Sequence, residues 1–339
     1  MKILIIGGTG TISTPITTAL AENAQNEVYV LNRGNHNDRL PPNIISLVGD
    51  INDKEAITSL IKEMTFDTVI NFILFTPAQA YDNIALFKGK TKQFIFISTV
   101  VTYNHDGAVC FNEEHSLGNR YSRYGQGKQA CEEIFRKAYQ EEGFPITIVR
   151  PSQTYSNDRI PLSIKGKNCY SVIKRMLEGK EVIIHGDGNS LWTCTHADDF
   201  ANGFVPLVGN PDTINEAYQI VSDEHVSWNM IYLYLAKLLN VPFKPIYITT
   251  DLLSKSKTYS LSESIQGDKQ FSHLFDTTKI KQAAPDFKCA ITIEKGLAMY
   301  LDYMEKHPEA KQADEKFDQW CDQVITAYKL AMKAVEEVL

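Results

Sequence analysis

The opening of the chain constrains its fold more than any other segment. An apolar, β-branched run over residues 2–6 leads directly into Gly7-Gly8-Thr9-Gly10-Thr11-Ile12-Ser13, and a helical pattern follows over residues 14–22. Gly7 permits the tight turn from strand to helix, and Gly10 lets the backbone approach a ligand closely at the helix N-terminus, where N–H groups favour anions. A strand, a glycine-rich turn and a helix in this order predict a βαβ unit that binds the pyrophosphate of a dinucleotide.

One position of this turn departs from the usual dinucleotide pattern. The third glycine, which lets the helix pack closely on the strand, is replaced by Ser13, although a small residue still fits there. We therefore predict that Gly7, Gly10, Thr11 and Ile12 contact the dinucleotide. The alternative is a glycine turn with a purely structural role.

The end of the second predicted strand, residues 27–31, indicates which dinucleotide binds. An NAD site usually carries an Asp or Glu here that binds the ribose hydroxyls, whereas a 2′-phosphate calls for a cation. This chain has Asn32 and Arg33 instead, and Arg33 offers a planar fork to a phosphate. NADP is therefore favoured over NAD, the alternative being that Arg33 is a solvated loop cation. After the third strand, Asp50 and Ile51 stand where an adenine pocket would form, with Asp50 accepting from the exocyclic amine.

Short β-rich runs alternate with helical patterns through the first half of the chain. Strands are predicted at residues 2–6, 27–31, 44–48, 68–72, 93–98 and 146–149, and helices at residues 14–22, 54–64 and 128–141. The alternation predicts an α/β fold, a Rossmann-type doubly wound parallel sheet with a smaller C-terminal substrate-binding domain. We expect a dinucleotide-binding domain over residues 1–155, completed by parts of 190–225. A mainly substrate-binding region is expected over residues 156–305, and a C-terminal amphipathic helix over 306–339.

Composition and charge exclude several classes of protein. The 339 residues include 34 Lys and Arg against 41 Asp and Glu, a net charge of −7, so a nucleic-acid partner is not predicted. Apolar stretches such as residues 69–75 are too short to span a bilayer, and the N-terminal run leaves no room for a signal peptide, so no membrane partner is predicted. The six cysteines are scattered without metal-binding spacing. We therefore predict no metal site and a reducing, cytoplasmic location.

A tyrosine and a lysine four residues apart follow the fifth predicted strand. The i, i+4 spacing puts Tyr124 and Lys128 on one helical face, directed at the carboxyl edge of the sheet, where a nicotinamide would lie. The Lys128 ammonium would lower the pKa of the Tyr124 phenol towards neutrality and could also hold the nicotinamide ribose. Thr99, at the end of the fifth strand, would orient a substrate oxygen by a hydrogen bond.

Taken together, these segments resemble a known family. The glycine turn, Ser98-Thr99, the Tyr124/Lys128 helix and Val149-Arg150-Pro151 occur in the order seen in extended short-chain dehydrogenase/reductases of the NAD(P)-dependent epimerase/dehydratase family. By this resemblance Thr99, Tyr124 and Lys128 are the catalytic residues, and Pro151 and Ser152 border the nicotinamide. The resemblance implies an NAD(P)-dependent oxidoreductase or epimerase acting on a secondary hydroxyl or ketone of a small-molecule substrate such as a sugar or sugar nucleotide.

Departures from the family pattern leave alternatives open. The segment between Asn71 and Phe94 is shorter than in typical sugar-nucleotide members, whose long helix there makes the two-helix contact of a homodimer, so a homodimer stays open. Val100 and Val101 stand where the nucleotide-sugar 4,6-dehydratases carry an Asp-Glu pair, which disfavours dehydration. The Asn32-Arg33-Gly34 strand end resembles an atypical branch that includes chloroplast RNA-binding proteins. The alternative function is a non-catalytic dinucleotide-binding regulator or an RNA-associated member of that branch.

A further pair of residues, Trp192 and His196, precedes Asp198-Asp199. The resemblance places this stretch near the substrate, which makes both side chains candidate substrate contacts. The alternative is that this stretch is structural and that Asp198 or Asp199 caps the following helix.

Overall fold

The computed structural model describes all residues from Met1 to Leu339 and divides them into two compact units, each built from three separate stretches of chain. Unit 1 comprises Met1–Thr154, Thr195–Asp223 and Phe275–Ala290. Unit 2 comprises Tyr155–Cys194, Glu224–Leu274 and Ile291–Leu339. None of the helices combines the length and the apolar character needed to cross a lipid bilayer.

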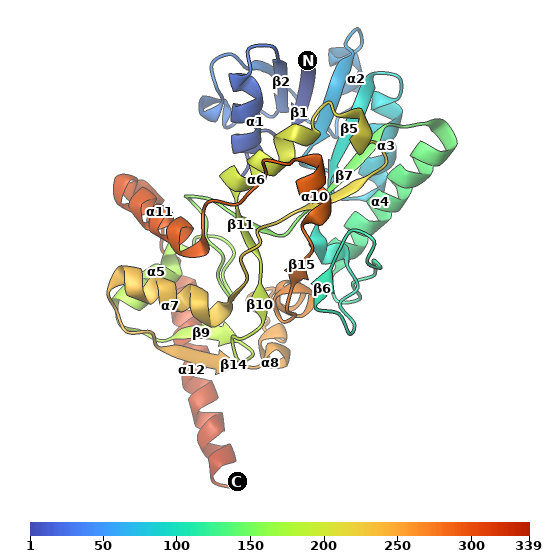
Figure 1. Cartoon of the computed structure of the whole chain (residues 1–339). Helices are drawn as coiled ribbons and strands as arrows, with labels where there is room; N and C mark the ends of the chain where they lie inside the picture. The colour runs from blue at the N-terminus through green and yellow to red at the C-terminus, as the bar shows by residue number, and fades with distance from the viewer. The chain divides into compact units, whose positions relative to one another are not determined.

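Unit 1 is organised around a seven-stranded sheet in the order β12-β7-β5-β4-β1-β2-β3 (Figure 1). Each neighbouring pair is parallel. The strands are β1 (Lys2–Ile6), β2 (Glu27–Asn32), β3 (Ile45–Val48), β4 (Phe66–Asn71), β5 (Thr91–Ile97), β7 (Ile146–Pro151) and β12 (Ala217–Ile220). The predicted doubly wound parallel sheet is therefore confirmed. Its strand order reverses at β1, and folds of this kind bind ligands beyond the carboxyl ends of the strands at the point of reversal.

Helices cover both faces of this sheet because successive strand residues point to opposite faces. Ile3 and Ile5 of β1 pack with α1, α6 and α10, whereas Leu4 and Ile6 pack with α2, α3 and α4. The helices are α1 (Ser13–Glu22), α2 (Lys54–Leu60), α3 (Pro77–Phe87), α4 (Arg123–Glu142), α6 (Ala197–Phe204) and α10 (Thr278–Ala283). Unit 1 also contains η1 (Asn37–Arg39), η2 (Val100–Thr102), β6 (Cys110–Phe111), η3 (Val205–Leu207) and η4 (Pro211–Thr213).

Helices α3 and α4 of unit 1 differ from the sequence prediction. The list of predicted helices omits residues 77–87, where only a truncated form of the family's long helix is expected, and α3 forms there. It is started by a capping box in which Thr76 and Gln79 bond each other's backbone N–H groups, with Pro77 at the first helical position. The helix predicted at residues 128–141 begins at Arg123, because the Ser122 hydroxyl accepts from the Gly125 N–H and caps an earlier start. Tyr124 therefore lies inside the first turn of α4.

Unit 2 has its own hydrophobic core, which includes the fully buried Trp228 and Tyr300. Its strands form two small pairs, β9 with β14 in parallel and β10 with β13 in antiparallel orientation. The elements are α5 (Tyr170–Leu177), β9 (Val182–His185), β10 (Leu191–Trp192), β13 (Val226–Ser227), α7 (Trp228–Leu239), β14 (Pro245–Ile248), α8 (Thr250–Ser254), α9 (Ser262–Ser264), the π-helix η5 (Ile265–Lys269), α11 (Ile293–Lys306), η6 (Pro308–Ala310) and α12 (Glu315–Glu336). Three short strands lie where the chain leaves one unit for the other: β8 (Gln153–Tyr155), β11 (Cys194–His196) and β15 (Leu274–Phe275).

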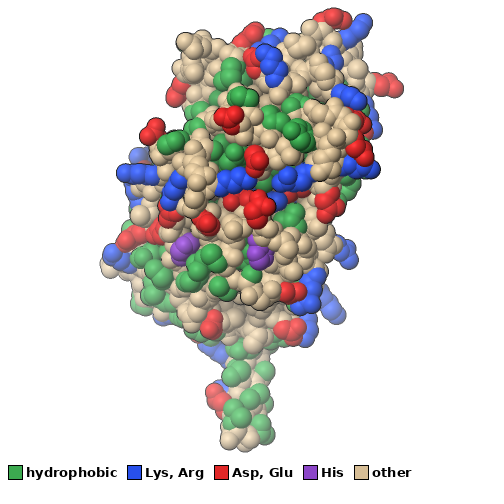
Figure 2. Space-filling model, turned by 45° about the vertical axis from the view of Figure 1, so that its right-hand side comes forward, with side chains coloured by type: hydrophobic (Ala, Val, Ile, Leu, Met, Phe, Trp, Pro, Cys, Tyr) green, Lys and Arg blue, Asp and Glu red, His purple; other side chains and the backbone are tan.

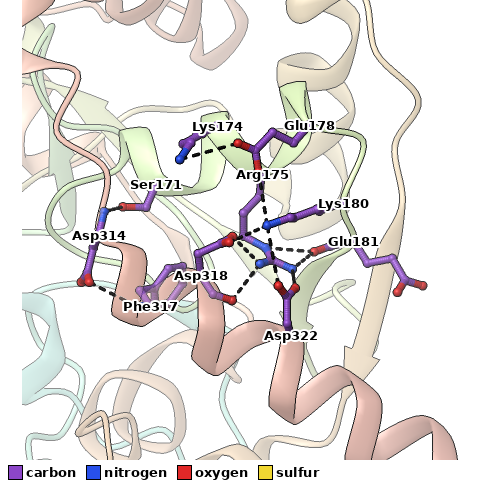
Figure 3. Close-up of polar contacts among 10 residues, drawn as sticks. All are labelled: Ser171, Lys174, Arg175, Glu178, Lys180, Glu181, Asp314, Phe317, Asp318 and Asp322. Atoms are coloured by element: carbon purple, nitrogen blue, oxygen red, sulfur yellow. Dashed lines mark hydrogen bonds and ion pairs between the residues drawn. The ribbon is translucent and has the colours of Figure 1, made fainter.

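A buried arginine, Arg175, makes several of the polar contacts between the C-terminal helix α12 and the rest of unit 2 (Figure 3). The Arg175 guanidinium donates to Asp318 Oδ1 at 2.5 Å, to Asp322 Oδ1 at 2.8 Å and to the Glu181 carbonyl oxygen at 3.0 Å. Phe317 and Ile325 bury the first turns of α12 in the core. From residue 329 onward every side chain is exposed, and Figure 2 shows hydrophobic side chains on this projecting end of the helix.

Candidate functional site

The predicted site residues of unit 1 gather at one edge of the sheet. The Gly7 N–H donates to the Leu31 carbonyl at 3.1 Å, and the Gly49 N–H donates to the Asn32 carbonyl at 2.9 Å. These two bonds extend the hydrogen-bond pattern of the parallel sheet by one residue beyond β1 and β3. The carboxyl edge of a doubly wound sheet is where ligands of such folds bind.

The glycine turn closes tightly around β1. Gly7 adopts a left-handed conformation with φ +83°, and a Cβ there would lie 2.7 Å from Cγ2 of Ile73. A Cβ on Gly8 would lie 3.1 Å from both Val30 Cγ1 and Thr17 Oγ1. Gly8 is thus the residue that lets α1 pack closely on β2, a role that the sequence pattern reserves for the missing third glycine.

The first turn of α1 leaves donors for an anion. The buried Ser13 hydroxyl accepts from the Gly10 N–H at 2.8 Å, so it stays within the turn. The N-cap residue Ile12 supplies no side-chain hydrogen bond, and the first turn carries no acidic residue. Thr11 and Ile12 are half-buried. An uncapped N-terminus with its positive dipole end fits a diphosphate.

The end of β2 holds an unsatisfied donor. Asn32 Oδ1 accepts from the Gly34 N–H at 2.8 Å, but the Asn32 Nδ2 group is buried without a hydrogen-bond partner. Burying a donor unpaired is costly, so an acceptor such as a ribose or phosphate oxygen fits this position. Arg33 is exposed beside it. Asp50 Oδ1 accepts from the backbone and side-chain N–H groups of Asn52, and these bonds hold the pKa of Asp50 below its usual value.

Tyr124 and Lys128 lie together on α4, one at the surface and one beneath it. Tyr124 is 43% exposed, whereas Lys128 is 2% exposed. The Lys128 Nζ atom lies 5.8 Å from the centroid of the Tyr124 ring and donates to the carbonyl oxygens of Leu74 and Ile97, both at 2.7 Å. An ammonium has three donors, so these two bonds leave one more. The structure therefore brings this predicted pair together at the end of β5.

Burial controls the charge of this lysine. Loss of hydration lowers the pKa of Lys128 to about 7, while the neighbouring Cys131 and Glu132 oppose that shift. The Leu74 and Ile97 carbonyl oxygens stabilise the ammonium by hydrogen bonds. Lys128 can therefore change its protonation state near neutral pH, as perturbed groups at functional sites commonly do.

Two glycines between Tyr124 and Lys128 bring α4 close to neighbouring backbone. A Cβ on Gly125 would lie 2.7 Å from the carbonyl oxygen of Val101, and a Cβ on Gly127 would lie 3.3 Å from that of Phe75. The sequence prediction gives neither glycine a role. A Gly-x-Gly pair inside a predicted helix, where glycine is unfavourable, is the signal that could have identified this close approach.

The other predicted residues lie at the ends of β5 and β7. Thr99 is 6% exposed, and its Oγ1 atom accepts from the Val101 N–H at 3.2 Å. Pro151 is buried at the end of β7, and the Ser152 Oγ atom is buried without a hydrogen-bond partner. Two buried polar atoms without partners, Asn32 Nδ2 and Ser152 Oγ, therefore lie at the edge where the dinucleotide is expected.

The expectation that Asp198 or Asp199 caps α6 is wrong. The N-cap residue is His196, whose Nδ1 atom accepts from the Asp198 N–H at 3.3 Å. A histidine can take this place because its unprotonated ring nitrogen is an acceptor, as a carboxylate oxygen is. Among the described residues, no group of His, Cys, Asp and Glu side chains is arranged to hold a metal ion.

Comparison with known proteins adds to this geometry. A model of the family described as "NAD dependent epimerase/dehydratase family" matches residues 3–221. A dTDP-glucose 4,6-dehydratase of Actinoplanes sp. is 24% identical over 314 residues, which cover 82% of this chain and 94% of that protein.

Solved structures are similar over most of the chain. A UDP-glucuronic acid 4-epimerase from Bacillus cereus, in complex with UDP-glucuronic acid and NAD, superposes with a TM-score of 0.72 at 20% identity and covers 90% of this chain and 99% of its own. A UDP-glucose 4-epimerase from Thermotoga maritima with UDP-glucose gives a TM-score of 0.70 at 24% identity, with the same shares of 90% and 99%. At these identities the two structures establish a shared fold.

Proposed function

Since the chain belongs to the NAD dependent epimerase/dehydratase family and is an enzyme of that family, we propose that it converts a sugar nucleotide by reversible oxidation of a secondary hydroxyl. The observation that carries the proposal is the pairing of a half-exposed Tyr124 with a buried Lys128 at the carboxyl edge of the sheet. Either epimerisation or net reduction would use the same groups.

Tyr124 is the residue that exchanges a proton with the substrate oxygen. A free tyrosine, with a pKa near 10, is a poor base at neutral pH. A protonated Lys128 beneath the ring stabilises the phenolate form of Tyr124 by its opposite charge. The exposed position of Tyr124 lets its hydroxyl reach a ligand, and the Thr99 hydroxyl at the end of β5 is the group that orients the substrate oxygen.

The nicotinamide dinucleotide supplies a hydride acceptor and donor when bound. The first turn of α1, with Gly7, Gly10, Thr11 and Ile12, binds the diphosphate. Asn32 and Arg33 bind the adenosine ribose and its phosphate, which favours NADP, and Asp50 and Ile51 border the adenine. Lys128, Pro151 and Ser152 border the nicotinamide end. The unpartnered Asn32 Nδ2 and Ser152 Oγ atoms support this assignment.

The substrate class follows from the relatives. The similar proteins named above are epimerases and a dehydratase of UDP- or dTDP-linked sugars. Val100 is buried and apolar directly after Thr99, so the chain has no carboxylate there to assist loss of water. We therefore favour a 4-epimerase or ketoreductase over a 4,6-dehydratase.

The observations do not favour the non-catalytic alternative. A regulator that only binds a dinucleotide does not require a lysine buried beneath a tyrosine. An RNA-binding surface requires clustered cations. On the face drawn in Figure 2, Lys and Arg side chains lie among Asp and Glu side chains, and the net charge of the chain is −7. All six cysteines are free, which supports the proposal of a reducing, cytoplasmic location.

One experiment tests the proposal directly. The full chain is mixed with NADPH or NADH, and binding is followed by cofactor fluorescence. It is then incubated with UDP-glucose, UDP-glucuronic acid and dTDP-glucose in the presence of NAD⁺ or NADP⁺, and with their 4-keto derivatives in the presence of NADH or NADPH. The products are identified by NMR. Formation of a 4-epimer or a reduced sugar is expected. Dinucleotide binding without conversion of any sugar nucleotide, by wild type and by Tyr124→Phe alike, would contradict the proposal.

A further inference from the structure

A buried carboxylate lies one helical turn beyond Lys128. Glu132 on α4 is 1% exposed, and both of its carboxylate oxygens are bonded. Oε1 accepts from Ser98 Oγ at 2.5 Å and from Arg150 Nε at 3.0 Å, and Oε2 accepts from Arg150 Nη2 at 2.6 Å. Tyr124, Lys128 and Glu132 follow one another at i, i+4 and i+8, so they share one face of α4.

The partners of Glu132 come from the two strand ends that carry other site residues. Ser98 directly precedes Thr99 after β5, and Arg150 is the penultimate residue of β7, just before Pro151. Arg150 is itself 2% exposed, and it donates through Nη1 to the Tyr103 hydroxyl at 3.2 Å and to the Glu113 carbonyl oxygen at 3.0 Å. One carboxylate therefore connects α4, β5 and β7 in a fixed register.

Stability alone does not account for such a pair. The cost of removing two charges from water usually cancels most of their attraction, and apolar residues of similar size often serve as well. A bidentate arginine and carboxylate do, however, fix direction and distance more sharply than apolar packing does. The pair lies where α4 must be held so that Tyr124 and Lys128 meet the end of β5.

Glu132 also acts on the charge of Lys128. The titratable groups that act on the Lys128 ammonium are Tyr124, Cys131 and Glu132 from its own helix. The carbonyl oxygens of Leu74 and Ile97 and the rings of Phe75 and Phe96 also lie against it. Among these, Glu132 is the carboxylate. Its charge raises the pKa of Lys128 against the effect of burial. Without that charge, and with the Arg150 guanidinium left unpaired nearby, the lysine would lose its proton at lower pH.

We propose that Glu132 is a positioning residue that fixes the Tyr124/Lys128 turns of α4 against the ends of β5 and β7. Its effect on turnover rests on the proposed function. Its effect on Lys128 does not, and the two are measured separately.

The test compares Glu132→Gln with the matched control Glu133→Gln, because Glu133 is exposed on the same helix. Titration of ε-¹³C-labelled lysine by NMR, with Lys128 assigned from Lys128→Met, needs no turnover. We expect the Lys128 midpoint to fall by about one pH unit in Glu132→Gln and to stay unchanged in the control. On a converted sugar nucleotide, kcat should fall about 10- to 100-fold with KM within about threefold, and the alkaline limb of kcat should move to lower pH.

Ser98→Ala keeps the proposal testable if Glu132→Gln does not fold. This variant removes one hydrogen bond from Glu132 and leaves the ion pair intact, and we expect a several-fold loss of kcat at unchanged KM. A folded Glu132→Gln with an unchanged Lys128 midpoint would overturn the proposal, as would an unchanged kcat in Ser98→Ala. If wild type converts no sugar nucleotide, the proposed function fails, and the lysine titration still decides the role of Glu132.

Discussion

The Nζ atom of Lys128 lies 2.7 Å from the carbonyl oxygen of Ile97, the last residue of β5. A side chain of the fourth helix is thereby bonded to the end of the central sheet, one turn below Tyr124. This bond holds the lysine where it can act on the phenol, and it does so at the expense of burying an ammonium.

Replacing Lys128 should therefore separate stability from activity. Burial lowers the pKa of Lys128 from its usual value to about 7, so between about pH 7 and pH 10 the unfolded chain binds more protons than the folded chain. The contribution of Lys128 to the free energy of unfolding therefore rises with pH across that window. It is lost again as the pH falls towards 7. We expect Lys128→Met to melt at the same or a higher temperature than wild type at pH 6, with the difference shrinking by pH 10.

Turnover should fall about 100-fold or more in the same variant, because the phenolate loses its counter-charge. Lys137→Met, an exposed lysine on the same helix, serves as the control and should change neither property. A Lys128→Met protein that is much less stable than wild type at pH 6 would show that the buried ammonium stabilises the fold.

Tyr124→Phe removes only the hydroxyl that we propose exchanges the proton. We expect NADPH affinity within about threefold of wild type and a loss of turnover of about 10²- to 10⁴-fold. Tyr81→Phe, which changes a tyrosine 61% exposed on α3, is the matched control. Retention of a tenth or more of wild-type turnover by Tyr124→Phe would rule out this hydroxyl as the main acid and base.

Gly125→Ala should displace α4. The added Cβ would lie 2.7 Å from the Val101 carbonyl oxygen, a backbone atom that cannot rotate away. Although alanine favours helices by about 1 kcal/mol over glycine, the clash should produce a net destabilisation of about 1–3 kcal/mol, measured by urea unfolding, and a loss of turnover. Gly127→Ala, with its nearest contact at 3.3 Å, should have a smaller effect on both.

Arg33→Ala tests the preference for NADP. If the Arg33 fork binds the 2′-phosphate, NADPH affinity should fall about tenfold or more, whereas NADH affinity should change by less than about threefold. Both are measured by cofactor fluorescence at one fixed ionic strength. Arg39→Ala, in the same loop region, controls for the loss of a surface charge. Equal effects on NADPH and NADH would show that Arg33 does not discriminate between them.

His185 in unit 2 should make the protein sensitive to acid. Its Nε2–H donates to the Lys269 carbonyl oxygen at 3.0 Å, so Nδ1 accepts from Ser163 Oγ at 2.6 Å, and the ring is neutral. Burial lowers the pKa of His185 to about 4. As the pH falls, the His185 ring of the unfolded chain takes up a proton before that of the folded chain does. The contribution of His185 to the free energy of unfolding is therefore full above pH 6.5, and it falls by about 3 kcal/mol as the pH drops to 4. His185→Gln should flatten this dependence in urea titrations between pH 4 and 7, whereas the exposed His36→Gln should not.

Much of the candidate site can be proposed from sequence because its signals are local. The glycine turn after β1 and the Tyr124/Lys128 spacing each lie within a few residues, and local geometry places them without knowledge of the rest. The carbonyl oxygens of Leu74 and Ile97 could not be predicted, because a backbone acceptor leaves no mark in residue identity. The link from Glu132 to Arg150 joins two strand-and-helix units, so its register depends on packing that a linear pattern does not encode.

Unit 2 is less predictable for a different reason. Its strands are two to four residues long and pair across long intervals, as β9 does with β14. Such short runs carry little periodicity, and their pairing depends on tertiary packing. His196 illustrates the same limit within unit 1, since it caps α6 although two better-known capping residues follow it.

The three-part composition of unit 1 bears on how the protein is synthesised. The sheet face that carries Ile3 and Ile5 is covered by Phe200, Phe204 and Ile280. These three residues leave the ribosome long after the residues of β1 have been synthesised. A nascent chain ending near residue 155 would expose this hydrophobic surface to water. It would also lack β12, the outermost strand of the sheet. We expect such a truncated polypeptide to aggregate or recruit chaperones, and the dinucleotide fold to become self-sufficient only once residues up to about Ala290 have emerged.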